Sequence, residues 1–207
     1  MMLDMGNEVI PVVRRTPVLA GVCATDPFRS MSRLLKQVKD AGFVGVQNFP
    51  TVGLYDGIFR QNIEETGFGY KKEVDMIRLA HQMGLLTTPY VFDCEQARMM
   101  ASVGADVIVA HMGLTSSGSV GASTVKSLDA CVALINAIAG AARDVNPDVL
   151  VLCHGGPIAM PEDAEFVQTR CTCIDGFYGA SSVERLPVEE AILAQVRSFK
   201  STAIRQS

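Results

Sequence analysis

The 207-residue sequence predicts an α/β fold, a (β/α)8 TIM barrel of which about six βα units are visible. Short apolar runs alternate with amphipathic helical stretches, which is typical of a parallel sheet. The connections after the expected strands are long and polar, whereas those before them are short, as on the two faces of a barrel. No G-x-G-x-x-G follows the first strand, which disfavours an open dinucleotide-binding sheet.

Six apolar runs predict the strands. Each run is too short for a helix and is rich in Val, Ile, Leu or aromatic residues, as is usual for strands buried on both faces. Three of the runs follow Gly42, Gly84 or Gly104, where a left-handed glycine ends the preceding helix. The runs span residues 18–23, 43–46, 85–92, 107–110, 149–153 and, more weakly, 176–179.

Helix starts are marked by capping residues and prolines. Asp26-Pro27 places an N-cap before a proline at the first helical position. Asp93 with Gln96 forms a capping-box pattern, and Pro161 and Pro187 are each followed by acidic residues that favour a helix N-terminus. The predicted helices span residues 27–41, 69–83, 94–103, 125–144, 161–170 and 187–201.

The chain is expected to form one domain, residues 1–207, that lacks the first two βα units of a barrel. A complete barrel usually needs about 250 residues, and residues 5–15 read as the end of a helix that leads into the first visible strand. Strands 18–23 and 176–179 should therefore not hydrogen-bond to each other. Their open edges predict a homo-oligomer.

Composition excludes several classes of protein. A net charge of −4 disfavours a nucleic-acid binder, which needs a basic face against phosphates. No apolar run is long enough for a membrane span, and the first residues are acidic where a signal peptide would be basic. The six cysteines are scattered and read as free thiols, which predicts a cytoplasmic protein. Its expected partner is a small anionic substrate.

Two histidines are the strongest candidates for catalysis. His111 and His154 each end a predicted strand, so both side chains are expected at the catalytic face of a barrel. Imidazole can act there as an acid, a base or a metal ligand. The alternative is that each ring simply bonds to a loop carbonyl. His81, near the end of a helix, is expected to interact with the helix dipole.

Two small-residue loops are candidates for binding an anion. They follow what would be strands 7 and 8 of a barrel, where phosphate is often bound. Residues 181–184 are expected to form the short extra helical turn of such a site, capped by its first serine. Ordinary turn chemistry is the alternative. The candidate residues are Gly155, Gly156, Gly179, Ser181 and Ser182.

The connection from residue 48 to about residue 69 is longer than the usual few residues. Such loops serve as lids, as binding loops or as packing arms. Asn48 and Thr51 are expected to bind substrate, and Glu64 is either an acid, base or metal ligand or half of a solvated acidic pair. Asp26, at the end of the first strand, is either a magnesium ligand or a helix N-cap.

Six motifs in order make the chain similar to a known family: VLAGVCATDPF (18–28), GVQNFPTVG (45–53), EETG (64–67), AHMGLT (110–115), CHGGPI (153–158) and DGFYGASS (175–182). They resemble the phosphoenolpyruvate hydrolase-like TIM-barrel family, also called the TIM-barrel signal transduction family, which has a relative in a plant tobamovirus-resistance protein. The resemblance covers essentially the whole chain.

The resemblance implies a hydrolase acting on phosphoenolpyruvate or phosphonopyruvate. His111 and His154 would handle protons, the small-residue loops would bind the anion, and Asp26 or Glu64 would hold a magnesium ion. The family's signalling name implies an alternative, a non-catalytic barrel that senses a ligand or binds a protein. Convergence of imidazoles and carboxylates with shifted pKa values on one pocket would favour the enzyme.

Overall fold

The structure is a computed structural model that describes residues 1–202, and it confirms a parallel α/β fold. Every strand pair is parallel, and neighbouring strands follow one another in chain order. The strands are β1 (Leu19–Gly21), β2 (Gly45–Gln47), β3 (Leu86–Thr87), β4 (Tyr90–Val91), β5 (Val107–His111), β6 (Leu150–His154) and β7 (Gly176–Phe177). The helices are α1 (Met2–Val9), α2 (Met31–Asp40), α3 (Gly57–Glu65), α4 (Tyr70–Gln82), α5 (Cys94–Ser102), α6 (Leu128–Arg143), α7 (Pro161–Arg170), α8 (Ser181–Glu184) and α9 (Leu186–Lys200).

The third predicted strand is divided at Pro89 into β3 and β4. Thr88 N donates to Val46 O of β2 at 3.0 Å, whereas Pro89 O accepts from Val109 N of β5 at 2.9 Å. Proline has no N–H to continue the first ladder. The segment therefore changes its partner from β2 to β5, and it links a three-stranded sheet to a four-stranded sheet.

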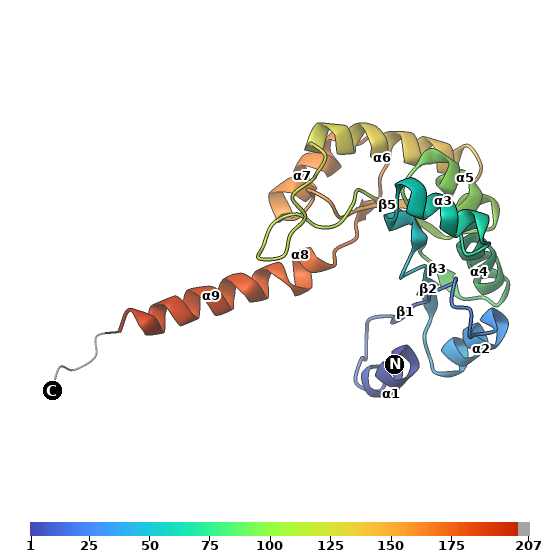
Figure 1. Cartoon of the computed structure of the whole chain (residues 1–207), viewed down its shortest axis with the longest axis horizontal. Coiled ribbons are helices and arrows are strands. Elements are labelled where there is room, and N and C mark those ends of the chain that lie inside the picture. The colour runs from blue at the N-terminus through green and yellow to red at the C-terminus, as the bar shows by residue number, and fades with distance from the viewer. Residues whose placement is uncertain (203–207) are drawn as a thin grey trace.

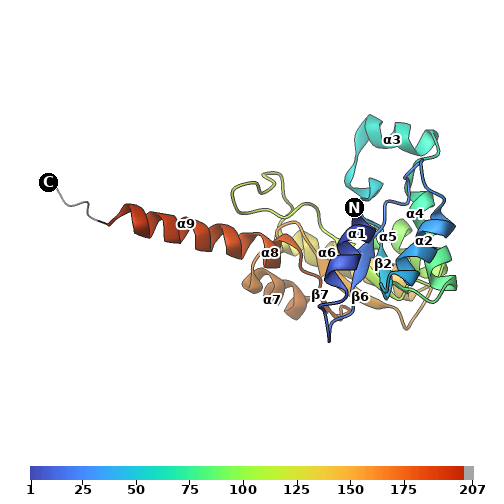
Figure 2. The ribbon, with the colours of Figure 1, turned by 90° about the horizontal axis from the view of Figure 1, so that it is seen from below.

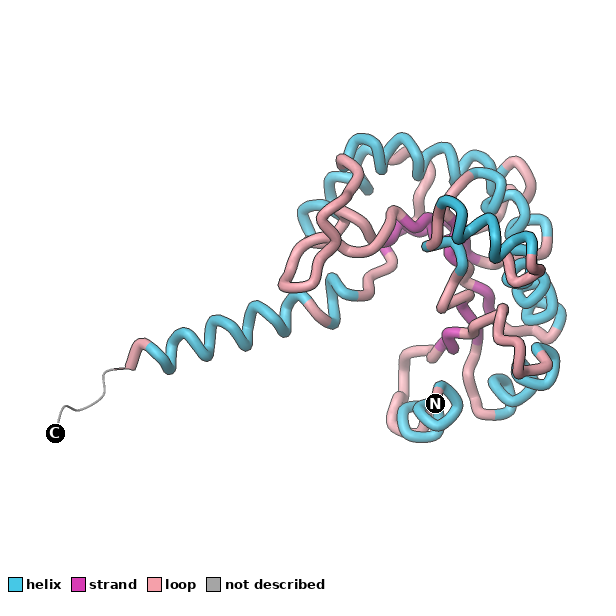
Figure 3. Tube along the Cα trace, in the orientation of Figure 1, coloured by secondary structure: helices cyan, strands magenta, loops and turns pink. Residues whose placement is uncertain are grey.

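The strands form an arc with helices along its outer side. Figure 1 shows α2, α4, α5 and α6 outside this arc, and Figure 3 shows the strands along its inner side. Within residues 1–202, β1 pairs only with β2 and β7 pairs only with β6. The prediction that the first and last strands do not hydrogen-bond to each other is confirmed. That the chain lacks the first two βα units of a barrel stays a prediction.

Side chains on the central strands alternate between two faces. Ile108 of β5 and Val151 of β6 are fully buried in the main core, which lies between the strands and the outer helices. Val107 and Val109 face the inner side, where they form a second apolar cluster with Tyr90. This period of two brings every second side chain of a strand to the same face.

Local capping explains where the helices begin. The Asp93 carboxylate accepts from Gln96 N at 2.8 Å, as the capping-box pattern predicts. The predicted start of a helix at Pro27 is wrong: α2 begins at Met31, because the Asp26 carboxylate accepts instead from Phe28 N in a turn. α3, within the long connection 48–69, was not predicted from the sequence as a separate helix.

The last helix leaves the body of the molecule. α9 extends away from the arc in two perpendicular views (Figures 1 and 2). One side of it carries a stripe of exposed apolar residues: Val188, Ile192, Val196 and Phe199. These positions lie close together on a helical surface. Across residues 1–202, neither α9 nor any other helix has the length and apolarity of a membrane span.

We predict that this apolar stripe pairs with the α9 stripe of a second copy. Glu189 and Glu190 lie near the beginning of α9, and Arg197 and Lys200 lie near its end, so an antiparallel pair brings opposite charges together. Ile192→Glu should convert the associated chain to a monomer in analytical ultracentrifugation, because it places a charge within the stripe. Ser198→Glu adds the same charge to another side of the helix and should leave association unchanged. A monomeric wild-type protein would contradict the prediction.

Candidate functional site

Two adjacent strands end on histidines that face each other. β5 and β6 pair in parallel from Val107↔Leu150 to His111↔His154. Residues paired across a sheet point to the same face, so both imidazoles lie on the inner side. Their ring centroids are 4.6 Å apart at an interplanar angle of 72°. His111 is only 4% exposed and His154 only 6%.

Aromatic side chains hold the two imidazoles in place. Phe92 stacks on His111 with ring centroids 4.8 Å apart, and Tyr90 stacks on His154 at the same separation. Tyr178 follows β7 and meets His154 edge to face at 5.9 Å. Tyr90 and Phe92 come from the segment after Pro89, so the division of the third strand leaves these rings beside the histidines.

Hydrogen bonds assign a different tautomer to each ring. Gly113 N donates to His111 Nδ1 at 3.1 Å, so this nitrogen carries a lone pair and the proton of the neutral ring sits on Nε2. His154 Nδ1 lies 2.6 Å from Tyr178 O. A carbonyl oxygen can only accept, so His154 Nδ1 carries the proton and its Nε2 carries the lone pair.

Both histidines are neutral near pH 7. Burial, together with smaller effects of the neighbouring His154 and Lys126, lowers the pKa of His111 to about 3. Burial also lowers the pKa of His154, against a smaller upward effect of its hydrogen bond to the Tyr178 carbonyl. Burial favours neutral imidazole because the charged form loses its hydration.

A cavity of about 400 Å³ opens beside the two rings, and we call it the histidine cavity. Two loops that follow strands, residues 113–115 and 179–181, form part of its wall. Glu184 is the acidic residue of the wall, and no Lys or Arg lies in its described lining. The lining residues are Gln47, Phe49, Tyr90, His111, Gly113, Leu114, Thr115, His154, Tyr178, Gly179, Ala180, Ser181 and Glu184.

One buried donor in this wall has no partner. Gln47 Nε2 is inaccessible to solvent and makes no hydrogen bond within residues 1–202. Gln47 ends β2, so it reaches the wall from a different strand than the histidines. A buried amide N–H without a partner costs stability, and because this atom is inaccessible neither a water molecule nor a ligand in the cavity contacts it.

The predicted residues of the two small-residue loops fall into two groups. Gly179 and Ser181 line the histidine cavity, whereas Ser182 does not. Gly155 and Gly156 have positive φ angles of 72° and 61°, and they bring the β6 loop against the loop after β5. Gly156 N donates to Gly113 O at 2.7 Å, so the β6 loop positions Gly113, which lines the cavity. The short turn α8 is present, but its N-cap is Ala180 and not Ser181.

Asn48 and Thr51 lie outside the lining of the histidine cavity, in a buried network around Glu73. The Glu73 carboxylate accepts from Asn48 Nδ2 at 2.5 Å, Thr51 Oγ1 at 2.7 Å and Val52 N at 2.7 Å. Asn48 Oδ1 in turn accepts from Tyr90 N at 2.6 Å. The network therefore joins the loop after β2 to the backbone that carries the Tyr90 ring.

Glu73 is a buried acid that the sequence did not indicate. Its side chain is fully buried in α4, and burial raises the pKa of the carboxyl to about 7. Its three hydrogen bonds from Val52, Thr51 and Asn48 act in the opposite direction, because they stabilise the charged form. An acid in a helix pattern reads as solvated, so only the tertiary structure reveals this role.

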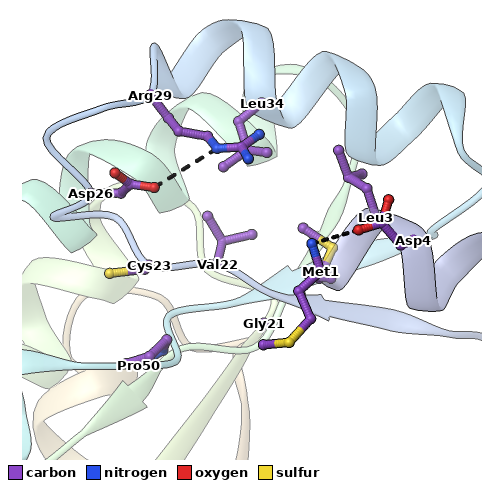
Figure 4. A pocket seen from close by; sticks show the side chains of 11 residues that line it. Met1, Leu3, Asp4, Gly21, Val22, Cys23, Asp26, Arg29, Leu34 and Pro50 are labelled. Atoms are coloured by element: carbon purple, nitrogen blue, oxygen red, sulfur yellow. Dashed lines mark ion pairs between the residues drawn. The ribbon is translucent and has the colours of Figure 1, made fainter.

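The remaining predicted acids lie away from the histidines. The Glu64 carboxylate accepts from Arg60 Nε at 2.7 Å and from Tyr70 N at 3.1 Å, so it caps α4. Asp26 lies 3.9 Å from Arg29 in a different pocket (Figure 4). Within residues 1–202, no three His, Cys, Asp or Glu side chains are placed to hold a metal ion. The role of Asp26 as a magnesium ligand stays a prediction.

Comparison with known proteins identifies relatives over nearly the whole chain. The sequence profile of a family described as phosphoenolpyruvate hydrolase-like matches residues 1–202. The chain is 62% identical over 202 residues to the ToMV susceptible protein tm-1(GCR26) and to the ToMV resistance protein Tm-1(GCR237), both from Solanum lycopersicum. These matches cover 98% of this chain but only 27% of each tomato protein.

The solved structures that resemble the chain are TIM-barrel enzymes. One is a sialic acid aldolase from Ruminococcus gnavus, a catalytic lysine mutant. It is 16% identical, with a TM-score of 0.51, over 84% of this chain and 52% of that protein. At this level of identity the likeness shows the fold alone, and the fold agrees with the barrel that the sequence predicts.

The raised pKa of Glu73 predicts a pH-dependent contribution to stability. The folded pKa of about 7 lies above the ordinary 4.5, so this contribution is full below pH 4.5 and is lost as pH rises through 7. The loss amounts to about 3 kcal/mol. Glu73→Gln cannot ionise and should lack this decline when free energies of unfolding are measured from pH 4.5 to 8. Glu165→Gln, on the exposed side of α7, is the matched control. A Glu73→Gln profile parallel to that of the wild type would contradict the prediction.

The lowered pKa of His111 predicts a contribution to stability with the opposite dependence on pH. Its folded pKa of about 3 lies below the ordinary 6.5, so its contribution is present above pH 6.5 and is lost as pH falls toward 3. The full loss is about 5 kcal/mol. In urea titrations, His111→Asn should therefore lose less stability than the wild type between pH 6.5 and 4. An equal loss in both proteins would show that His111 takes up its proton without a cost to the fold.

Proposed function

Because the chain belongs to the phosphoenolpyruvate hydrolase-like family, we propose that the histidine cavity hydrolyses a small phosphorylated or carboxylated acid. Phosphoenolpyruvate and phosphonopyruvate are the proposed substrates. One observation carries the proposal: two neutral imidazoles with complementary tautomers meet in one cavity at the carboxyl ends of adjacent parallel strands. Active sites of TIM-barrel enzymes lie at this end of the strands.

The tautomers suggest a role for each ring. His154 Nε2 carries a lone pair and can take a proton from an attacking water, which makes it the candidate general base. His111 Nε2–H can donate to a substrate oxygen on which negative charge develops. The low pKa of His111 supports this role, because the ring stays a neutral donor and does not take up the proton itself.

The proposed reaction balances without an oxidant or a reductant. The water oxygen forms a bond to phosphorus, and its proton goes to His154 Nε2. In phosphoenolpyruvate the bond from phosphorus to oxygen breaks, and in phosphonopyruvate the bond from phosphorus to carbon breaks. In both cases the electron pair leaves with the three-carbon fragment as the enolate of pyruvate. The proton on His154 Nε2 then passes to the terminal carbon of the enolate, which gives pyruvate and restores the neutral ring.

The charge of such a substrate needs compensation. The described lining of the cavity offers neutral donors, namely the Ser181 hydroxyl and the His111 N–H, and it contains no Lys or Arg. A magnesium ion brought with the substrate would supply positive charge. Metal dependence therefore belongs in the test of the proposal.

We predict release of phosphate and pyruvate from phosphoenolpyruvate or phosphonopyruvate, measured with and without magnesium. His154→Asn should lower the rate by about 10²-fold or more, because it removes the general base. His111→Asn should lower it by a similar factor, because it removes a donor to the developing charge. His81→Gln is the control, since His81 is an exposed residue in the last turn of α4. Unchanged turnover in both cavity variants would remove the histidines from the mechanism.

A second candidate function is a non-catalytic domain that senses a ligand or binds a protein. The observation that favours it is the exposed apolar stripe of α9, which a catalytic role does not require. The same assay separates the two candidates. A wild-type protein that binds these acids in calorimetry but releases neither phosphate nor pyruvate would support the binding domain.

A further inference from the structure

The two rings offer the histidine cavity one donor and one acceptor. The Gly113 N–H occupies the lone pair of His111 Nδ1, which leaves Nε2–H as a donor. The Tyr178 carbonyl occupies the proton of His154 Nδ1, which leaves Nε2 as an acceptor. Within residues 1–202, neither Nε2 atom has a hydrogen-bond partner, and neither is among the buried polar atoms that lack one. Both atoms are therefore open to a ligand.

We propose that this pair interconverts the keto and enol forms of a small carbonyl compound, including compounds that carry no phosphate. His154 Nε2 takes a proton from the carbon next to the carbonyl group. The C–H electron pair becomes a carbon–carbon double bond, and the carbonyl π pair moves onto oxygen, where His111 Nε2–H holds it. Return of the proton from His154 to carbon restores the carbonyl compound.

Enolisation needs the arrangement that the two backbone contacts impose. A base must reach carbon while a neutral donor reaches the neighbouring oxygen, so two rings in the same tautomer would lack one of the two groups. Stacking by Phe92 and Tyr90 prevents the rings from turning over to exchange these roles. A neutral imidazole donor also suits a developing enolate, since it stabilises the charge without giving up its own proton first.

The charge of the cavity points to a 2-oxo acid with a single negative charge. The described lining holds Glu184 and no Lys or Arg, which disfavours a ligand of high negative charge. The Ser181 hydroxyl in the lining supplies a neutral donor for one carboxylate. The inference rests on the proposed function only for the histidine roles, because enolisation requires no bond to phosphorus.

The test is deuterium uptake into pyruvate, the probe, in deuterium oxide. Loss of the methyl signal in proton NMR reports each cycle of enolisation. The wild-type protein should accelerate this loss over protein-free buffer. His154→Asn can still donate to the Tyr178 carbonyl but has no base at the Nε2 position, and it should lower the rate by about 10²-fold or more.

A pair of variants at His111 isolates the donor. In His111→Asn the side-chain oxygen can still accept from Gly113 N, but no group reaches the Nε2 position. In His111→Gln an amide N–H reaches that position. The glutamine variant should therefore retain more exchange than the asparagine variant, which a merely structural role for the ring would not produce. His81→Gln should exchange pyruvate at the wild-type rate.

Two further measurements test this inference separately from the proposed hydrolysis. Nitrogen NMR of the wild-type rings should show the proton on Nε2 of His111 and on Nδ1 of His154, and the opposite assignment would overturn the inference. Exchange without phosphate release would uphold it and refute the proposed hydrolysis. Phosphate release without exchange of pyruvate would overturn it and leave the hydrolysis standing.

Discussion

The register between β5 and β6 is the constraint on which the site depends. Five residue pairs, from Val107↔Leu150 to His111↔His154, place both imidazoles on the inner face and at the same height. A shift of one residue would turn one histidine toward the outer helices and bring its neighbour inward. The apolar neighbours oppose such a shift, because Ile108 and Val151 are fully buried on the helix side. The packing of the core thus fixes the register that places His111 beside His154.

Around this pair, His111 is oriented by a backbone group from the loop beyond its own strand, and His154 is oriented by one from the loop beyond the neighbouring strand β7. Gly113 follows β5 and Tyr178 follows β7, and their N–H and C=O groups decide which ring nitrogen remains free. Gly156 holds Gly113 in turn through the bond from Gly156 N to Gly113 O. Gly113 and Tyr178 therefore determine which nitrogen of each ring carries the proton, and Gly156 of one candidate anion loop supports the first of these contacts.

The sequence predicts the parts of this arrangement that depend on local patterns. The alternating strands, the histidines at the ends of two of them and the Asp93 cap follow from spacing and from capping chemistry, and the structure contains each of them. Glu73 escaped prediction because its partners come from a loop more than 20 residues away, and nothing in the helix pattern distinguishes it from a solvated acid. The predicted helix start at Pro27 was wrong because the Asp26 side chain closes a turn before the helix begins at Met31.

The open arc places the histidines at unequal distances from its two edges. β5 and β6 are each paired on both sides, and each has one neighbour of two residues, namely β4 beside β5 and β7 beside β6. His154 lies on β6, whose outer neighbour β7 is an edge strand of only two residues. The Tyr178 carbonyl that orients His154 comes directly after this edge, and it is tied to β6 by the bond from Tyr178 N to Cys153 O at 2.9 Å. The orientation of the basic ring therefore depends on the last strand of the described sheet, whereas the donor ring is oriented by Gly113, in the loop after its own strand.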